Sequence, residues 1–423
     1  MKNEEGRPSP QELERMDPEA RAEHTDAMLR EIVTYAYENA PAVRERLNSV
    51  GITSQDIQTY KDLEKIPVLR KDDLVELQKR NPPFGGYLAV PVDSLERIYQ
   101  SPGPIYDPER RRRLSMSAGA PGFGKGQIVL NTWSYHITPA GLQIDKALRE
   151  MGCTVVPTGT GNTDLQVQIM HDLQVTGFCG TPSFLKVVID RAEQMGYDFK
   201  KDFNLQWAMV VGEMGGEELR KVFQEKYGIF CLGGNAYGTA DIGGIAMECE
   251  QKTGMHVSMD AIVEIADPST GKQLSPNEIG EVVVTPFDEV YPLIRFGTGD
   301  LSCFDFEPCA CGRTTPRLPK IMGRVGDAVR VRGMFVHPKQ TDEVMQRFSH
   351  ISRYQLVVTR PEHRDEMVLQ VELGDESADK EQLIGQLDKD FRDVCKVRFD
   401  RVEFVAAGSI PEDAKPVVDQ RAY

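Results

Sequence analysis

The stretch QIVLNTWSYHITPAGLQIDKALREMGCTVVP (residues 127–157) decides the fold class, because it reads as a strand, a helix and a second strand in succession. QIVL and TVVP are short β-rich runs, and the segment between them predicts a helix from about Leu142 to Met151. Downstream, TGFCG and WAMVVGE continue the strands, with a helix before the first of them and another starting near Glu217. Strands that alternate with helices in this way predict an α/β fold with a largely parallel sheet.

The segments on either side of this core have patterns of their own. Residues 9–47 predict a helical lead-in that is broken by Pro41. Between about residues 260 and 305, the runs AIVEIAD, GEVVVTPF and LIRFGTGD alternate with turn signals. Short strands joined by turns predict an antiparallel, β-rich subdomain.

Roughly the last hundred residues predict a compact unit with the strands YQLVVTR, MVLQVEL and VRFDRVEFVA. A helix before the last strand has an apolar face made of Leu383, Leu387, Phe391 and Val394. A glycine-containing stretch at 323–327 suits a hinge. We therefore expect a large domain at residues 1–322 and a small α+β domain at residues 328–423.

Composition limits the classes of function. The 423-residue chain has 50 Lys plus Arg against 65 Asp plus Glu, a formal net charge of -15, so nucleic acid is not an expected partner. Its length exceeds the roughly 250–300 residues at which single cores stop growing, which favours two or more domains. No run of about 18 apolar residues predicts a membrane span, and the first residues do not read as a signal peptide. We expect a cytoplasmic protein without a membrane partner.

Four of the eight cysteine and seven histidine residues form a candidate metal set. Cys249-x6-His256 is followed by Cys309-x-Cys311, and three thiolates with one imidazole are a structural zinc set. The closed four-ligand set argues against catalytic zinc. The spacing is not that of a zinc finger, and the alternative is that these cysteines are small buried apolar residues. The other five cysteine residues are expected in the core: Cys153, Cys179, Cys231, Cys303 and Cys395.

The stretch GAPGFGKG (Gly119 to Gly126) matches the phosphate-loop pattern G-x4-G-K, but Gly126 stands where a magnesium-binding Ser or Thr belongs. A phosphate loop also needs a strand before it and a helix after it. Here a basic helical turn precedes the loop and the strand QIVL follows it. We interpret the stretch as a glycine-rich turn, which makes a phosphate-loop nucleoside triphosphatase the weaker alternative.

Four segments in order point to a known family: NAYGTADIG (from Asn235), LIRFGTGDLS (from Leu293), IMGRVGDAVRVRGMFVHP (from Ile321) and GSIPEDAKPVVDQR (from Gly408). Together they resemble the adenylate-forming enzymes, and more closely the phenylacetate-CoA ligase family. The resemblance covers nearly the whole chain and takes in CACGRTTPR. It implies a large multi-subdomain N-terminal adenylation domain, with parallel sheets and a β-rich subdomain, and a small mobile C-terminal domain.

The resemblance also implies the nucleotide site. Asp300 matches the acid that holds the ribose hydroxyls, Arg324 matches a residue that contacts the ribose or the phosphates, and Tyr237 would lie against the adenine. Asp241 stands where the family has the Glu that binds Mg2+. The full nucleotide set is Gly212, Glu213, Asn235, Ala236, Tyr237, Gly238, Thr239, Asp300 and Arg324.

Four further residues are expected around the acid that reacts. Lys415 matches the family's C-terminal lysine, which contacts the substrate carboxylate and the α-phosphate, and an ammonium suits a developing phosphoryl charge. For His136, in NTWSYHITPAG, a place in the acyl pocket and a place in the core are both open. Tyr135 and Gly234 complete the expected acyl pocket.

Two segments depart from the family pattern. Where a Ser/Thr/Gly-rich loop normally wraps the triphosphate, this chain has SPGPIYDPE (residues 101–109), whose prolines remove N–H donors and whose Asp107 and Glu109 add negative charge. Either ATP is held elsewhere, for example by TGTGNT (residues 158–163), or full adenylation is impaired. The hinge reads GRVGD, with Gly326 at the first of two acidic positions.

The function that follows is an ATP-dependent carboxylate–CoA ligase that converts a small, aromatic or hydroxylated acid through an acyl-AMP into a thioester. The expected ligands are ATP or AMP, Mg2+, coenzyme A and structural Zn2+. Two alternatives stay open: an adenylating enzyme with an acceptor other than CoA, and a zinc-stabilised binding protein that has lost ATP turnover. The acid and the oligomeric state stay open too, with a homodimer as one expectation.

Overall fold

The computed structural model describes residues 8–101, 105–109, 123–211, 217–232, 236–325, 329–331, 334–336, 338–361, 366–374, 379–395 and 397–421. The chain divides into two compact units. The first comprises residues 1–278, 282–298 and 303–320, and the second comprises 279–281, 299–302 and 321–423. Among the described helices, none is long and apolar enough to cross a membrane.

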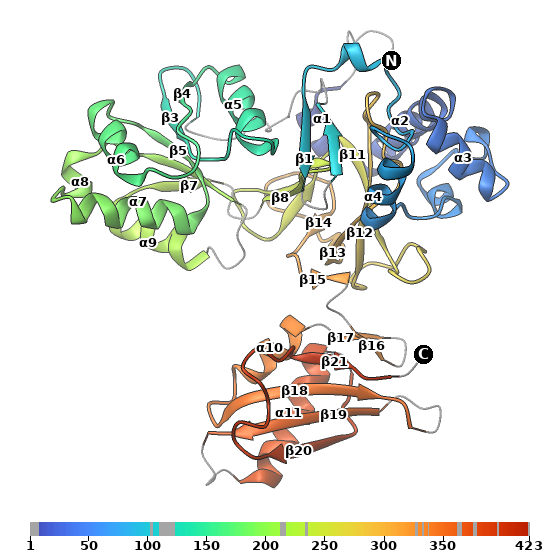
Figure 1. Cartoon of the computed structure of the whole chain (residues 1–423), viewed down its shortest axis with the longest axis vertical. Coiled ribbons are helices and arrows are strands. Elements are labelled where there is room, and N and C mark those ends of the chain that lie inside the picture. Colours follow the sequence, from blue (N-terminus) through green and yellow to red (C-terminus); the bar gives the residue numbers. More distant parts are fainter. Residues whose placement is uncertain are drawn as a thin grey trace. The chain divides into compact units, whose positions relative to one another are not determined.

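A five-stranded parallel sheet, on the left in Figure 1, forms one part of the first unit, as predicted. Its strand order is β4-β3-β5-β6-β7, so the chain moves to one side of β3 and then crosses to the other. The carboxyl ends of β3 and β5 therefore form a topological switch point, where open α/β sheets bind ligands. The strands are β3 (Ile128–Asn131), β4 (Thr154–Val156), β5 (Gly177–Gly180), β6 (Trp207–Val210) and β7 (Phe230–Leu232).

Both faces of this sheet are apolar because successive side chains point to opposite sides. Val129 and Cys179 pack in one core cluster with Leu148 of α5 (Ala140–Glu150). Leu130 and Phe178 pack in another, against α6, α7 and α9. The helices on this second side are α6 (Thr163–Asp172), α7 (Pro182–Gln194), α8 (Phe199–Asp202) and α9 (Glu217–Tyr227).

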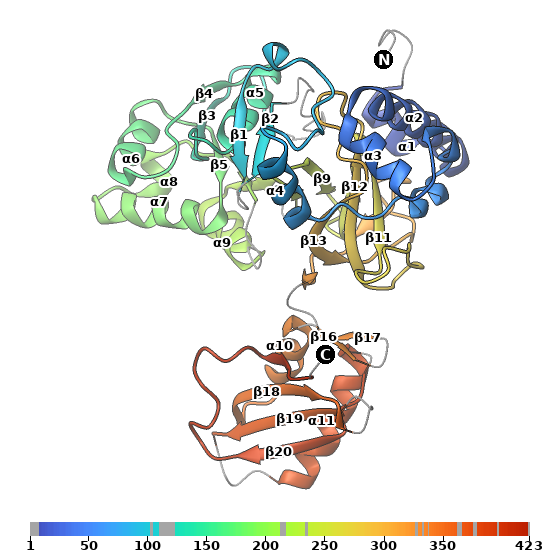
Figure 2. The same ribbon diagram turned by 45° about the vertical axis from the view of Figure 1, so that its right-hand side comes forward.

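The helical lead-in has one more break than the sequence predicts. Ser9 caps the first helix through a capping box with Glu12, as expected. That helix then ends, because Asp17 caps the next one with Pro18 at its first position. Figure 2 shows these helices beside the antiparallel strands. They are α1 (Pro10–Arg15), α2 (Pro18–Asn39), α3 (Pro41–Ser49) and α4 (Lys71–Arg80), with short 3-10 turns at Ser54–Asp56, Tyr60–Lys65 and Val92–Ser94.

The β-rich region contains two four-stranded sheets and a hairpin. One sheet has the order β14-β10-β9-β8, the other β11-β12-β13-β15, and β1 pairs with β2. The strands are β1 (Ile98–Ser101), β2 (Ile105–Pro108), β8 (Ala236–Thr239), β9 (Gly243–Glu248), β10 (Met255–Val257), β11 (Ala261–Ala266), β12 (Gly280–Pro286), β13 (Phe296–Ser302), β14 (Arg317–Leu318) and β15 (Gly323–Arg324).

The last residue of the turn before β13, Arg295, forms a buried ion pair with Glu264. Arg295 has φ of 53°, is 1% exposed, and contacts Glu264, which is 0% exposed. Its Nη2 donates to Glu264 Oε1 at 2.9 Å and to the Gly271 carbonyl at 2.7 Å. Its Nη1 donates to the Ile66 carbonyl at 2.7 Å, and the Leu69 N–H donates to the Arg295 carbonyl at 2.8 Å. One side chain thus joins the N-terminal segment to the β-rich region.

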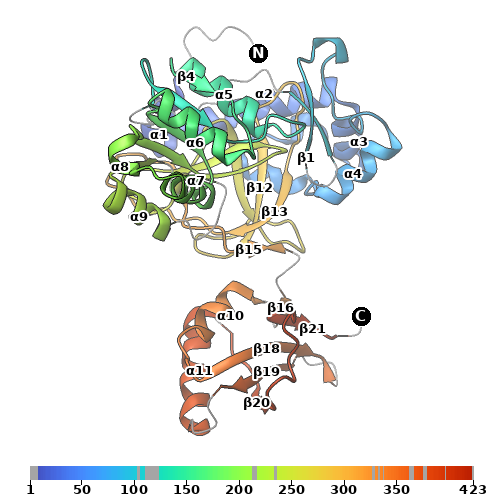
Figure 3. The same cartoon turned by 60° about the vertical axis from the view of Figure 1, so that its left-hand side comes forward.

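The C-terminal unit is a mixed sheet with α10 and α11 against one face (Figure 3). The predicted strands and helix are present, but Cys395 rather than Val394 completes the fully buried stripe of the helix with Leu383, Leu387 and Phe391. The sheet has the order β20-β19-β18-β21. The elements are β16 (Val329–Val331), β17 (Met334–Val336), α10 (Pro338–Met345), β18 (Ile351–Thr359), β19 (Glu366–Leu373), α11 (Lys380–Cys395), β20 (Arg401–Val405) and β21 (Val417–Asp419).

Replacing Glu264 with Gln leaves the buried Arg295 guanidinium without its countercharge. The free energy of unfolding is expected to fall by about 3 kcal/mol, because an uncompensated buried charge costs roughly 3–5 kcal/mol. Urea unfolding at pH 7 measures the change. The control is Glu76→Gln, because Glu76 pairs with Lys79 at the surface and both side chains are more than half exposed; it should change stability by less than about 0.5 kcal/mol. Equal effects of the two substitutions would contradict this role of the pair.

Candidate functional site

The carboxyl end of β3 carries a hydrogen-bonded group of polar side chains. Asn131, which is 0% exposed, donates through Nδ2 to the Tyr135 hydroxyl at 2.7 Å and to the Gly141 carbonyl at 3.0 Å. Tyr135 donates to Asp145 Oδ2 at 3.3 Å. Burial, followed by the charge of Asp145, raises the pKa of Tyr135. The phenol is therefore a neutral, fixed group, and His136 beside it is exposed.

The TGTGNT stretch lies at the same edge of the sheet. The Gly159 N–H donates to the Asn131 carbonyl at 3.1 Å, and the Thr158 hydroxyl donates to the same carbonyl at 3.3 Å. Gln166 of α6, 1% exposed, donates to the Gly159 carbonyl at 2.8 Å. This loop thus connects β4 to α6 directly above the end of β3.

Asp241 lies buried in the turn after β8 and is 1% exposed. Its Oδ2 accepts a hydrogen bond from Lys71 Nζ at 2.9 Å, and its Oδ1 accepts one from the Ser101 hydroxyl at 2.9 Å. The carboxylate therefore joins the first residue of α4 to the end of β1. Sequence analysis missed both partners, because a lysine that starts a helix and a serine that ends a strand have no distinguishing local pattern.

Tyr237 on β8 is 7% exposed, and its hydroxyl is fixed by a relay of hydrogen bonds. It donates to Thr298 Oγ1 at 3.0 Å, and Thr298 donates to the Val282 carbonyl at 2.9 Å. Thr298 lies two residues before Asp300 in the same FGTGD segment. Beside Tyr237, a Cβ atom on Gly238 would come within 2.4 Å of the Gly243 carbonyl oxygen, so this position requires glycine.

Asp300 and Arg324 face each other across two antiparallel strands. They are register partners on β13 and β15, and Arg324 Nε lies 3.1 Å from Asp300 Oδ1. The Asp300 side chain is 14% exposed and that of Arg324 is 66% exposed. The structure therefore brings together two residues that were predicted separately for the ribose and phosphates.

Lys415 is exposed in the loop that joins β20 to β21. Its backbone carbonyl accepts a hydrogen bond from Gln355 Nε2 at 3.0 Å. Ala236 and Thr239, at the two ends of β8, are both half-buried. Four other predicted residues lie outside the described residues: Gly212, Glu213, Gly234 and Asn235. The basic turn before QIVL, the first half of GAPGFGKG (residues 119–122), and Gly326 and Asp327 of the predicted hinge lie outside them as well.

In the segment SPGPIYDPE, Ser101 ends β1 and residues 105–108 form β2, which pairs with β1, and the two acids of the segment are buried rather than solvated. Glu109 is 4% exposed, accepts a hydrogen bond from the Tyr99 hydroxyl at 3.1 Å and pairs with Arg97 at 2.8 Å. Asp107 is also 4% exposed. The negative charge that Glu109 adds to this segment is therefore paired with the positive charge of Arg97.

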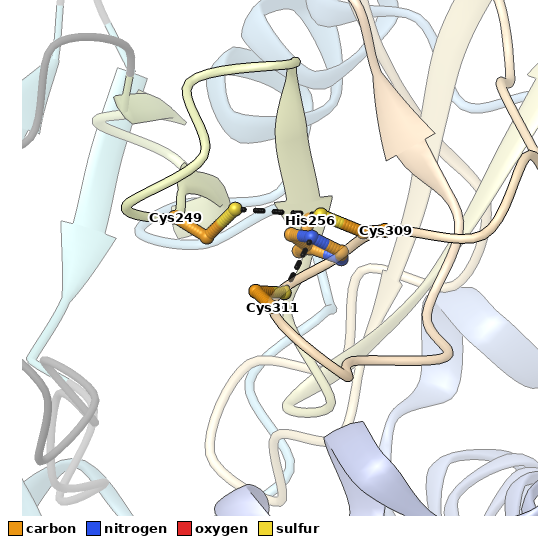
Figure 4. Close-up of side chains that lie close together, drawn as sticks. All are labelled: Cys249, His256, Cys309 and Cys311. Carbon is orange, nitrogen blue, oxygen red and sulfur yellow. Dashed lines mark hydrogen bonds between the residues drawn. The ribbon is translucent and has the colours of Figure 1, made fainter.

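The four predicted metal ligands lie together (Figure 4). Cys249 follows β9, His256 is on β10, and Cys309 and Cys311 lie in the loop before β14. Cys249 Sγ is 3.6 Å from Cys309 Sγ, and Cys311 Sγ is 3.5 Å from His256 Nε2. All four candidate ligand atoms lie within 4.8 Å of one another. Residues separated by up to 62 positions in the chain, from Cys249 to Cys311, thus converge on one point.

The surroundings fix the orientation of His256 and change the pKa values of three of these groups. His256 Nδ1 lies 3.1 Å from the Thr315 carbonyl oxygen, which leaves the Nε2 lone pair toward the cysteines. Burial lowers the pKa of His256 to about 4, so the imidazole is neutral at pH 7. Burial raises the pKa of Cys249 to about 11. For Cys309 burial acts in the same direction, but hydrogen bonds from Cys311 and other neighbours outweigh it and bring its pKa to about 7.

The N-terminal helix holds the loop that carries two of these cysteines. Arg15 Nη1 donates to the Cys311 carbonyl at 2.9 Å, and Arg313 Nε donates to Glu14 Oε2 at 2.8 Å. The Thr314 N–H donates to the Glu14 carbonyl at 2.7 Å. Sequence analysis did not find this contact, because about three hundred residues separate its two sides and neither side has a motif.

Comparison with known proteins agrees with this arrangement. Residues 127–286 match the family described as AMP-binding enzyme, and residues 333–421 match the AMP-binding enzyme C-terminal domain. A solved 2-hydroxyisobutyryl-CoA ligase, in an open conformation with 2-HIB-AMP and CoA, has a TM-score of 0.85 and 24% identity. The superposition covers 96% of this chain and 93% of that protein. The fold is therefore that of an AMP-binding, adenylate-forming enzyme.

Sequence relatives give the family. The phenylacetate-coenzyme A ligase of Thermus thermophilus is 30% identical over 381 residues, covering 86% of this chain and 84% of that protein. The Escherichia coli enzyme of the same name is 31% identical over 404 residues, covering 89% of each. This chain belongs to the phenylacetate-coenzyme A ligase family of AMP-forming acid–thiol ligases.

Proposed function

We propose that this protein is an ATP-dependent ligase that joins a small carboxylic acid to coenzyme A through an acyl-AMP. The main support is the family relationship, which extends over 86–98% of the chain in four phenylacetate-coenzyme A ligases. In the first step an acid oxygen attacks the α-phosphorus of ATP and pyrophosphate leaves. In the second step the CoA thiol attacks the acyl carbon and AMP leaves.

The described residues support a division of these tasks. Asp300 has an acceptor carboxylate for the ribose hydroxyls, and the exposed Arg324 beside it carries a cation toward the phosphates. Tyr237 and Gly238 line the adenine, with the Tyr237 ring held by Thr298. Lys415 brings an ammonium to the charge that develops between carboxylate and α-phosphate. The stretch at 323–327 acts as the hinge between the domains at residues 1–322 and 328–423.

Magnesium would bind at Asp241, since a carboxylate oxygen is a ligand that Mg2+ prefers. When bound, the ion neutralises phosphate charge during adenylation. Lys71 Nζ lies 2.9 Å from Asp241 Oδ2, so ammonium and metal compete for the same carboxylate. We expect the acyl group near Tyr135 and His136, which follow β3 at the switch point of the parallel sheet. Gly234, the third residue expected in the acyl pocket, lies outside the described residues. A homodimer and a cytoplasmic location stay predictions from the sequence.

The Cys249, His256, Cys309 and Cys311 set would bind structural zinc. Three soft sulfur ligands with one imidazole nitrogen are a donor set typical of structural Zn2+ sites. The hydrogen bond between His256 and Thr315 orients the imidazole ring, and Arg15 holds the loop of Cys309 and Cys311 by donating to the Cys311 carbonyl. Four protein ligands would leave no open position on the ion, so a bound zinc would stabilise the fold rather than activate water.

A purified sample is expected to turn over ATP when given the right acid. Pyrophosphate release, measured over a panel of aromatic and hydroxylated acids, should depend on the acid, and thioester should form when CoA is added. Asp300→Ala should lower the rate at least tenfold, because a ribose contact is lost. Lys125→Ala should leave it unchanged, since the GAPGFGKG stretch is not assigned a phosphate.

Three results of that assay would redirect the proposal. Acyl-AMP formation without CoA consumption would indicate another acceptor. Binding of acid or AMP by calorimetry with no pyrophosphate release for any acid would indicate a binding protein and would contradict the ligase assignment. Loss of nucleotide binding on Lys125→Ala would favour the phosphate-loop alternative.

The purified protein is expected to contain one zinc ion per chain. Cys311→Ser removes one thiolate, so zinc measured by inductively coupled plasma mass spectrometry should fall well below one per chain, with a lower melting temperature. Cys303→Ala, a buried cysteine outside the set, should keep the zinc. Wild-type protein that contains no zinc after expression in zinc-supplemented medium would contradict the assignment.

A further inference from the structure

The loop that carries Lys415 crosses the C-terminal sheet from one edge to the other. It leaves β20 after Val405 and enters β21 at Val417, and these strands are the two edges of the order β20-β19-β18-β21. We call residues 406–416 the Lys415 loop. Because Lys415 itself is exposed, its position depends on how the backbone of this loop is held.

Two charged side chains meet this loop on the sheet face opposite to the helices. Tyr354, Leu356 and Val358 of β18 point toward the core formed with α10 and α11. Arg353 alternates with them and lies opposite Glu372 of β19 in the antiparallel register. Figure 3 shows the helices on one side of these strands. The pair therefore stands on the face opposite to the helices, at the end of β19 that the loop passes.

The Glu372 carboxylate accepts a hydrogen bond from the backbone of the Lys415 loop. The Ile410 N–H donates to Glu372 Oε1 at 2.6 Å, and Glu372 is only 3% exposed. That hydrogen bond, assisted by the backbones of Gly408 and Ser409 and by the charge of Arg353, holds the pKa of Glu372 below its usual range despite burial. A carboxylate that accepts several N–H groups is a strong, charge-assisted anchor.

Arg353 and Gln355 donate hydrogen bonds to backbone carbonyls of the Lys415 loop. Arg353 Nη1 donates to the Ile410 carbonyl at 3.0 Å, and its Nη2 pairs with Glu412 at 2.5 Å. Gln355 Nε2 then donates to the carbonyl of Lys415 itself at 3.0 Å. The backbone of Ile410 is thus held at both its N–H and its carbonyl. Glu412 and Lys415, further along the loop, are held by Arg353 and Gln355.

We propose that Arg353 and Glu372 are positioning residues for adenylation, which fix the Lys415 loop so that the Lys415 ammonium reaches the reacting carboxylate and α-phosphate. This inference rests on the proposed function, because it presumes that Lys415 acts in the first half-reaction. A displacement of about 1 Å in a reacting group can cost up to about a hundredfold in rate. The cross-strand pair therefore controls the adenylation step and not the thioester step.

The test separates the two half-reactions. Glu372→Gln and Arg353→Lys are assayed for acid-dependent exchange of labelled pyrophosphate into ATP, and for thioester formation from supplied acyl-AMP and CoA. Both variants should lose about tenfold or more in the exchange rate and keep the thioester rate within about twofold. The matched control is Glu403→Gln on β20, which should change neither rate, because Glu403 contacts Gln370 of the neighbouring strand and Arg401 of its own strand.

A double-mutant cycle with Lys415→Ala distinguishes this inference from the proposed function. If Glu372 acts through Lys415, Glu372→Gln should cause no further loss in the Lys415→Ala background. Equal loss in both backgrounds, or an equal fall of both half-reactions in Arg353→Lys, would overturn the positioning role. An unchanged exchange rate in Lys415→Ala alone would instead contradict the role of Lys415 in the proposed function.

Discussion

The buried contact between Arg295 and Glu264 is the constraint on which the large unit depends. A guanidinium and a carboxylate removed from water are stable only if each finds all its partners, so the pair dictates where the surrounding backbone lies. Ile66 and Gly271 supply carbonyl oxygens from two distant segments. The left-handed residue Arg295 then ends the turn at which β13 begins. The strand that leads to Asp300 is positioned by this buried charge.

The net charge of the chain is negative, whereas two exposed site residues are cations. The chain has a formal net charge of -15, yet the proposed substrates ATP and CoA are anions. The described site residues include an exposed Arg324 and an exposed Lys415, while Glu109 is buried against Arg97. In the proposed function, cations close to the site matter more than the net charge, because Coulomb interactions with distant surface charges are screened within about 10 Å at ordinary salt concentrations.

Much of the fold could be predicted from sequence because its signals are local. Short apolar runs separated by amphipathic helices gave the parallel sheet, and the stripe through Leu387 and Phe391 gave the packed face of α11. The convergence of Cys249 with Cys309 was also predictable, since few thiols are present and chemistry restricts their use. These predictions needed residue type and spacing but no knowledge of tertiary contacts.

The contacts that hold the site residues in place could not be predicted in this way. Lys71 reaches Asp241 across 170 positions, and Arg15 reaches Cys311 across 296. Glu372 is anchored to the Lys415 loop only because β19 ends where that loop crosses the sheet. Ordinary charged residues become positioning groups through topology, and a single sequence contains no local signal for that.

The central claim is that the acid is activated as an acyl-AMP, and oxygen transfer tests it most directly. A turned-over acid labelled with 18O in its carboxylate should pass one labelled oxygen to AMP, because that oxygen bonds to the α-phosphorus and stays there when CoA takes the acyl group. Mass spectrometry of the AMP would show the label. Unlabelled AMP, or ADP with labelled inorganic phosphate, would contradict the account.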